Sequence, residues 1–182
     1  ATIDRLSGGR LFLGVGVGWM REEVAALGID PDERGSRTDE AIEALRVIWQ
    51  EDEPSWSGRH FPFDPVRSQP KPVQPTIPIL VGGHSPAAAR RAGRLGDGFF
   101  PLGLTGDLLD ARWQQVQQAA TDAGRDPAAV ALTLGGLLGD DAAIEAAVER
   151  GAERVVLSTR SADLPELRDA MDAAVAHARS LT

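Results

Sequence analysis

The stretch that decides the fold runs from Ile77 to Gly103 and reads IPILVGGHSPAAARRAGRLGDGFFPLG. Pro78 to Val81 is a short apolar run without alternation, which is typical of a strand that is covered on both faces. The run stops at Gly82-Gly83, and Ser85-Pro86 then supplies a helix N-cap and a first helical residue. Phe99-Phe100 opens another buried strand. The stretch therefore predicts a strand, a tight turn, a helix and a second strand, the repeating unit of an α/β fold.

The turn in this unit has two interpretations. Gly82 and Gly83 have no side chains, so a ligand can come close to the main chain there. The first N–H groups of the helix and the positive end of its dipole also point toward this turn, which favours an anion such as a phosphate. However, the same residues also make a good tight turn without any ligand, and His84 beside it has the ordinary interpretation of a satisfied polar group. Both interpretations stay open at this point.

Composition excludes several classes of function. The chain has 182 residues, of which 42% are hydrophobic, and no apolar run is long enough to cross a bilayer, so we expect a globular chain with no membrane segment. The net charge of -8 argues against a nucleic-acid-binding surface. Cysteine is absent, which excludes disulfides and favours the cytoplasm. His60, His84 and His177 are too scattered to suggest a metal site.

Strands and helices alternate along the chain. Residues 51–76 interrupt the rhythm as an excursion that carries a small hairpin, and the opening residues resemble the end of a helix that stops at Gly8-Gly9. We therefore expect one domain over residues 1–182, preceded by a missing N-terminal portion. Two architectures fit: an open doubly wound sheet, or a (β/α)8 barrel without its first strands. The predicted strands are 10–17, 78–82, 98–102, 130–135 and 154–158, and the predicted helices are 22–27, 38–50, 86–95, 107–123, 141–150 and 164–180.

The first predicted strand carries glycines at alternate positions. Alternation places Gly14, Gly16 and Gly18 on one face, so either a tightly packed element or a flat ligand is expected to approach that face. Trp19 follows directly, where a large aromatic side chain can form the wall of a pocket.

Three segments resemble a known family: LSGGRLFLGVGVGWMREEVAALG, ERGSRTDEAIEALRVIWQ and QPKPVQPTIPILVGGHSPAAARRAGRLGDGFFPLG. Over residues 1–103 they resemble the luciferase-like monooxygenase family, particularly its coenzyme F420-dependent oxidoreductases. The resemblance implies an α/β fold, a (β/α)8 TIM barrel of the luciferase-like type that is N-terminally incomplete here. Residues 1–182 would be its C-terminal portion, with the excursion at about 51–76, and the full-length protein would form a homodimer.

The resemblance also implies which residues contact the cofactor. Gly82, Gly83, His84 and Ser85 fall where F420-dependent members bind the cofactor phosphate through backbone N–H groups, and Leu102 and Gly103 fall where relatives contribute again to that site. Trp19 matches a position where some sugar-phosphate dehydrogenases of the family carry an acidic catalytic residue. Because tryptophan cannot transfer a proton in that role, we expect an apolar or aromatic substrate pocket there. No catalytic acid or base can be named.

The resemblance implies an oxidoreductase that transfers a hydride between coenzyme F420 and a small organic substrate. An FMN-dependent monooxygenase on the same fold is the nearest alternative, and a non-catalytic truncated barrel is a third. F420 is favoured by the closeness of the motifs and by a composition in which Lys71 is the only lysine among 19 basic residues, a bias typical of GC-rich genomes. We expect the 182-residue chain by itself to turn over poorly.

Overall fold

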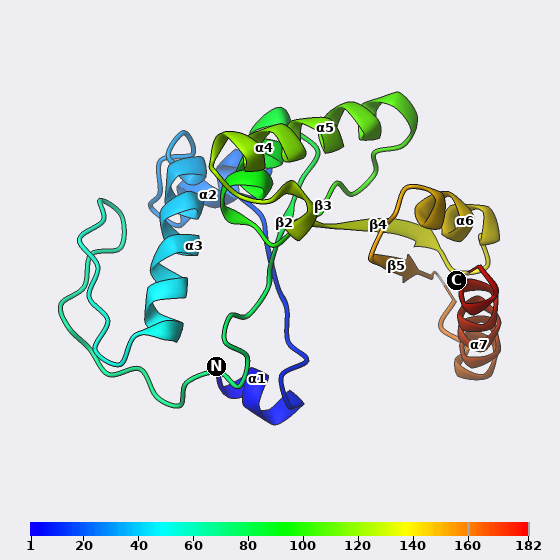
Figure 1. The fold of residues 1–182 in the computed structure, drawn as a ribbon, viewed down its shortest axis with the longest axis horizontal. Helices are drawn as coiled ribbons and strands as arrows, with labels where there is room; N and C mark the ends of the chain where they lie inside the picture. Colours follow the sequence, from blue (N-terminus) through cyan, green and yellow to red (C-terminus); the bar gives the residue numbers. More distant parts are fainter. Residues whose placement is uncertain (160, 182) are drawn as a thin grey trace.

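The computed structural model describes residues 1–159 and 161–181. The predicted alternation of helices and strands is confirmed (Figure 1). The first part of the chain contains α1 (Thr2–Ser7), β1 (Leu13–Val15), α2 (Arg21–Ala26), α3 (Arg34–Gln50), β2 (Ile79–Gly82) and α4 (Pro86–Leu95). The second part contains β3 (Gly98–Phe100), α5 (Gly106–Asp122), the short 3₁₀ helix η1 (Pro127–Ala129), β4 (Ala131–Leu137), α6 (Asp141–Glu149), β5 (Arg154–Ser158) and α7 (Leu164–Ser180).

The described strands form one five-stranded parallel sheet in the order β1-β2-β3-β4-β5. Spatial order thus follows chain order, as it does around a (β/α) barrel. A doubly wound sheet reverses its strand order at a switch point, so that alternative is wrong. The sheet is an incomplete barrel, because β1 and β5 lie at its two edges and do not pair with each other.

The sheet is also strongly curved. Neighbouring strands lie about 4.8 Å apart, so the outer strands of a flat five-stranded sheet would be about 19 Å apart. Yet the guanidinium of Arg154 in β5 lies 4.4 Å from the ring centroid of Phe12, which immediately precedes β1. A single side chain can make this contact only because the sheet bends until its two edges approach each other. The arc is therefore that of a barrel wall.

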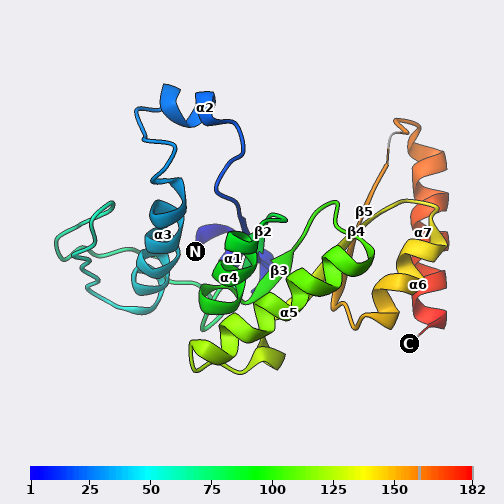
Figure 2. The same ribbon diagram turned by 90° about the horizontal axis from the view of Figure 1, so that it is seen from above.

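The hydrophobic core lies on one face of this arc. Alternate residues of the central strands, such as Val81, Phe99 and Leu134, pack in one cluster with Ile42 of α3 and Val116 of α5. Helices α4 and α6 contribute alanines to the same cluster. The helices thus cover the outer face, as in a barrel, with α3 at one end of the molecule and α6 and α7 at the other (Figures 1 and 2).

Local signals placed most helix boundaries correctly. Helix α4 begins as predicted, because the Ser85 hydroxyl accepts a hydrogen bond from the N–H of Ala88 at 3.2 Å and Pro86 takes the first position. Helix α3 was predicted from residue 38 but begins at Arg34. The Ser36 hydroxyl donates to the carbonyl of Glu33, three residues earlier, so the chain is already helical there.

The excursion between α3 and β2 is held against the rest of the chain. Its predicted hairpin is confirmed by an antiparallel bridge between Trp56 and Phe63. The carboxylate of Glu40 in α3 accepts hydrogen bonds from the N–H groups of His60 (2.9 Å) and Phe61 (2.7 Å) and from Nε1 of Trp56 (3.3 Å). Although burial alone raises the pKa of Glu40, these bonds hold that pKa below its usual value of 4.5.

The end of the excursion is held by a second carboxylate. Asp4 in α1 is fully buried and accepts hydrogen bonds from the N–H of Val73 (2.7 Å) and from the N–H and side-chain amide of Gln74 (3.1 and 2.7 Å). Burial by itself raises the pKa of Asp4, but these donors lower it below its usual value of 3.8. Segments about 70 residues apart in the sequence are joined in this way.

Two further features are absent from the residues that the structure describes. None of the helices is long and apolar enough to cross a membrane. The described residues also contain no group of three or more His, Asp or Glu side chains in a metal-binding arrangement.

Candidate functional site

The residues predicted to bind the cofactor gather at the carboxyl ends of β2 and β3. Because Gly82 pairs with Phe100, the loops that follow the two strands lie side by side. The N–H of Gly83 donates to the carbonyl of Phe100 at 3.2 Å, which joins the turn at residues 82–85 to the segment that leads to Leu102 and Gly103. The two groups of predicted contacts are therefore neighbours, at the edge of the sheet where parallel α/β folds place their ligands.

Backbone geometry explains one of the two glycines of the turn. Gly83 has φ +121°, a conformation that residues with side chains rarely adopt, and a Cβ at this position would lie 3.1 Å from the Cβ of Ala88. A Cβ at Gly82 would meet the carbonyl oxygen of Val15 at 3.4 Å. The turn thus passes close to the start of α4 and to β1, and at Gly83 only a residue without a side chain fits easily.

The turn also presents unused hydrogen-bond donors. Ser85 satisfies the N–H of Ala88 with its hydroxyl and that of Ala89 with its carbonyl. Within the described chain no hydrogen bond uses the backbone N–H groups of His84, Ser85 or Ala87. Donors that the fold leaves free at the N-terminus of a helix are suited to an anionic group. Gly82 to Ala87 are therefore compatible with a bound phosphate.

An arginine that the sequence did not single out contacts this turn. Nε of Arg112, in α5, donates to the backbone carbonyl of His84 at 3.0 Å. Helix α5 lies close to α4 because Gly93 of α4 has no side chain: a Cβ there would be 2.3 Å from the carbonyl oxygen of Val116. No local sequence pattern indicates this contact, because the contact depends on how α4 and α5 pack.

Leu102 and Gly103 form the other side of the site. The Leu102 side chain is 65% exposed, and its Cδ1 would lie 3.3 Å from a Cβ at Gly135. Gly103 has φ +83° and open space around it. A small cavity of about 160 Å³ lies beyond Gly103 between α5 and α6, with Arg150 among its lining residues. Leu102 thus presents an apolar surface to solvent beside the turn.

The structure places Trp19 away from any enclosed wall. Its side chain is 83% exposed, and Gly18 before it has φ +77°, so the strand has already ended. A groove of about 620 Å³ runs past this segment between the end of β1, α2 and α3, and Arg34, Arg37 and Phe61 are among its lining residues. The role of Trp19 in a substrate pocket stays a prediction.

The glycine face of β1 is open. A Cβ added at Gly14 or Gly16 would meet nothing within 4 Å. Packing within the described chain therefore does not explain why these positions lack side chains. The sequence left two explanations for these glycines. A tightly packed neighbouring element is not observed within the described chain, and a flat ligand close to this face stays a prediction.

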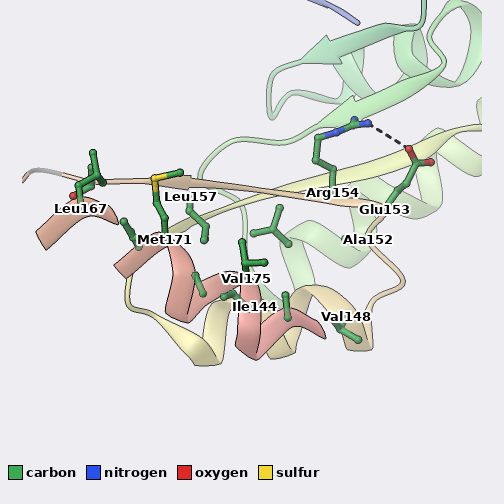
Figure 3. Close-up of a pocket in the computed structure, with 14 residues that line it drawn as sticks. Ile144, Val148, Ala152, Glu153, Arg154, Leu157, Leu167, Met171 and Val175 are labelled. Atoms are coloured by element: carbon green, nitrogen blue, oxygen red, sulfur yellow. Dashed lines mark hydrogen bonds and ion pairs between the residues drawn. The ribbon is translucent and has the colours of Figure 1, made fainter. Parts of the chain in front are cut away.

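A separate hollow lies between β5, α6 and α7 (Figure 3). Its walls are apolar, with Ile144, Leu157 and Met171 among them, and the Glu153–Arg154 pair lies at one side. The lining comes from β5, α6, α7 and the loops beside them, and it includes neither the turn at residues 82–85 nor Leu102 and Gly103. This hollow therefore belongs to the packing between helix and sheet and not to the candidate site.

Titratable groups at the candidate site do not form a catalytic pair. The His84 side chain is exposed and makes no hydrogen bond or ion pair within the described chain. A general base needs a partner or substrate within hydrogen-bond reach to be identified from geometry. Accordingly, the geometry of the site identifies no catalytic acid or base, and ligand binding at the turn stays a prediction.

The fold and the site together define a class: part of a (β/α) barrel with a glycine turn at the carboxyl ends of its strands. The sequence profile of the luciferase-like monooxygenase family matches residues 1–180. The chain belongs to this family.

Curated relatives cover part of the chain. An uncharacterized protein of Mycobacterium tuberculosis is 44% identical over 82 residues, which are 45% of this chain and 29% of the relative. An FMNH(2)-dependent dimethylsulfone monooxygenase of Pseudomonas putida is 36% identical over 128 residues, 68% of this chain and 35% of the relative. The chain thus spans about a third of the length of these curated relatives.

Solved structures support the fold over nearly the whole chain. An F420-dependent secondary alcohol dehydrogenase in complex with an F420-acetone adduct superimposes with a TM-score of 0.80 at 21% identity, covering 98% of this chain and 72% of that one. The monooxygenase RslO1 from Streptomyces bottropensis gives a TM-score of 0.65 at 28% identity and covers 99% and 52%. Structural neighbours therefore include both F420-dependent and monooxygenase proteins.

Proposed function

We propose that the protein is an oxidoreductase that transfers a hydride between coenzyme F420 and a small organic substrate. The observation that supports a cofactor site is the segment 82–87, which leaves three backbone N–H groups free at the carboxyl edge of a luciferase-like sheet. The choice of F420 follows from the resemblance of residues 1–103 to F420-dependent members of the family. When bound, the cofactor supplies the hydride chemistry. The chain's own residues bind its anionic group and hold it in place.

In this proposal each predicted contact has a distinct task. The N–H groups of His84, Ser85 and Ala87 donate to the anionic group, and Gly82 and Gly83 allow it to approach the main chain. Leu102 and Gly103 contact the cofactor from the neighbouring strand, where the exposed leucine excludes water from the bound group. Trp19 contributes to the substrate side. The homodimer of the full-length protein and its cytoplasmic location also stay predictions.

A second candidate is an FMN-dependent monooxygenase on the same fold. It is favoured by the 36% identity to a dimethylsulfone monooxygenase that uses reduced FMN. The same turn suits either cofactor, because both carry a phosphate that free N–H groups can bind. The two candidates therefore differ in the ring that the site accepts, and a binding experiment must compare them directly.

Titration of the purified protein with F420 and with FMN tests both candidates. The two cofactors have different absorbance and fluorescence spectra, so each Kd can be measured separately. We expect tighter binding of F420, with only slow hydride transfer by the 182-residue chain when a suitable substrate is supplied. Tighter binding of FMN would replace the first proposal with the second. If neither cofactor binds, the third alternative, a non-catalytic truncated barrel, is favoured.

A further inference from the structure

The charge of the protein opposes binding of an anion. The net charge is -8, and the free N–H groups of the turn are neutral donors. An anionic cofactor group therefore needs positive charge close to the turn, since long-range attraction from the rest of the molecule is missing. Arg112 is the cation that contacts the turn directly.

The contact of Arg112 also sets the direction of a donor. Nε of Arg112 holds the carbonyl of His84 toward α5 at 3.0 Å. Because a trans peptide is planar, the N–H of Ser85 in the same peptide group points the opposite way from that carbonyl. Arg112 thus directs the Ser85 N–H away from α5. This N–H is one of the donors that the fold leaves free.

Both the position and the charge of Arg112 suit an interaction with an anion at the turn. Helix α5, which carries Arg112, packs closely on α4 at Gly93 and is held there. The contact at Gly93 is made by the carbonyl of Val116, one helical turn after Arg112. The Arg112 side chain is half-buried, and within the described part of the chain it forms no ion pair with an acidic side chain. Its charge is therefore not neutralised by a neighbouring carboxylate.

We propose that Arg112 is a positioning residue for the anionic group of the cofactor: it fixes the His84–Ser85 peptide so that the Ser85 N–H faces the ligand, and its charge favours the anion there. This inference rests on the proposed function, because it concerns the same turn. It assigns a role to a residue that neither the motifs nor the turn itself identifies.

The test compares three variants of the full 182-residue chain by fluorescence titration with F420 and FMN. Arg112→Gln removes the charge, and Arg112→Lys keeps it while losing the planar guanidinium. Arg90→Gln, at an exposed position of α4 whose side chain makes no hydrogen bond or ion pair in the described structure, is the control with the same change in net charge. Thermal unfolding of each variant checks that the fold is kept.

We expect Arg112→Gln to raise Kd by about tenfold or more, in line with the loss of a charge-assisted contact. Arg112→Lys should recover part of the affinity, and Arg90→Gln should match the wild type. Added salt should weaken binding to the wild type more than binding to Arg112→Gln. A purely structural role of Arg112 would not produce this difference in salt dependence.

Two outcomes would overturn the inference in distinguishable ways. If the wild type binds a cofactor and Arg112→Gln binds it equally well, or if both show the same salt dependence, the role of Arg112 is wrong while the proposed function stands. If the wild type binds neither cofactor, the proposed function and this inference fail together. If Arg112→Gln does not fold, the salt dependence of cofactor affinity in the wild type and in Arg112→Lys tests the role of the charge instead. Attraction between the side-chain charge and the anion requires this affinity to fall with added salt in both proteins.

Discussion

Gly83 meets two demands at the same position. Its φ of +121° is unfavourable for residues with a side chain, and a Cβ there would press on Ala88 at the start of α4. The same lack of a side chain opens the main chain to a ligand. A substitution at Gly83 therefore affects stability and binding together, and the two effects must be separated by a control.

We predict that Gly83→Val weakens F420 binding by about tenfold or more, equivalent to ~1.4 kcal/mol, and lowers the free energy of unfolding by about 1–3 kcal/mol. Gly28→Val is the matched control, because Gly28 also has a positive φ of +73° but lies in open space after α2. It should lose stability and keep its affinity. Chemical denaturation and fluorescence titration measure the two effects. Unchanged affinity in Gly83→Val would show that the anion binds elsewhere.

Single residues differ in how far the sequence reveals them. The Ser85 cap and the glycine turn were predictable, because a helix N-cap and a positive φ are decided by a few consecutive residues. Arg112 was not, since its partner His84 lies 28 positions away and the contact depends on the packing of α5. The exposure of Trp19 was likewise decided by the end of β1, which stops earlier than predicted.

At the scale of elements, the excursion at residues 51–76 is fastened rather than free. Glu40 holds its hairpin, and Asp4 holds the approach to β2. Gly58 allows the first of these contacts, since a Cβ there would lie 2.1 Å from Oε1 of Glu40. The sequence predicted the hairpin, but it did not predict the carboxylates that hold the excursion, because their partners are backbone groups of distant segments.

We predict that Glu40→Gln lowers the melting temperature at neutral pH and makes residues 51–76 easier to cleave by limited proteolysis. The folded-state pKa of Glu40 lies below 4.5, so its stabilising effect is present above about pH 4.5 and is lost as the pH falls through the lower folded-state value. The difference in melting temperature between wild type and variant should therefore shrink in acid. Glu43→Gln, at an exposed position of the same helix, should match the wild type. A difference in melting temperature that stays constant from pH 7 to pH 3 would contradict this explanation.

At the scale of the whole molecule, the alternation of elements was predictable and their arrangement was not. Runs such as Arg154 to Ser158 show which residues form a strand, because β-branched residues cluster there. Pairing order is a non-local property, so the sequence left both a doubly wound sheet and a barrel open. The sequential order of the strands and the contact between Phe12 and Arg154 across the arc decide between them.

Burial is uneven along this arc, and local stability should follow it. Ile79 and Val81 of β2 and Ala89 of α4 are almost completely buried, whereas α7 buries only Ala174 among its described residues and leaves Met171 52% exposed. Each fully buried large apolar side chain contributes about 1.5–3 kcal/mol. Opening the centre of the sheet therefore costs more free energy than opening the end formed by β5 and α7.

We predict that backbone amides of residues 77–96 exchange hydrogen most slowly and that those of α7 exchange much faster, although α7 is the longer helix. Opening of α7 exposes little apolar surface that is not already exposed, so its free energy is small, whereas opening of β2 and α4 disrupts the main core. Hydrogen exchange followed by mass spectrometry, corrected for intrinsic rates, measures the two segments in one sample. Equal protection of both would mean that the arc unfolds as one cooperative unit, and the distribution of buried side chains would then not set its local stability.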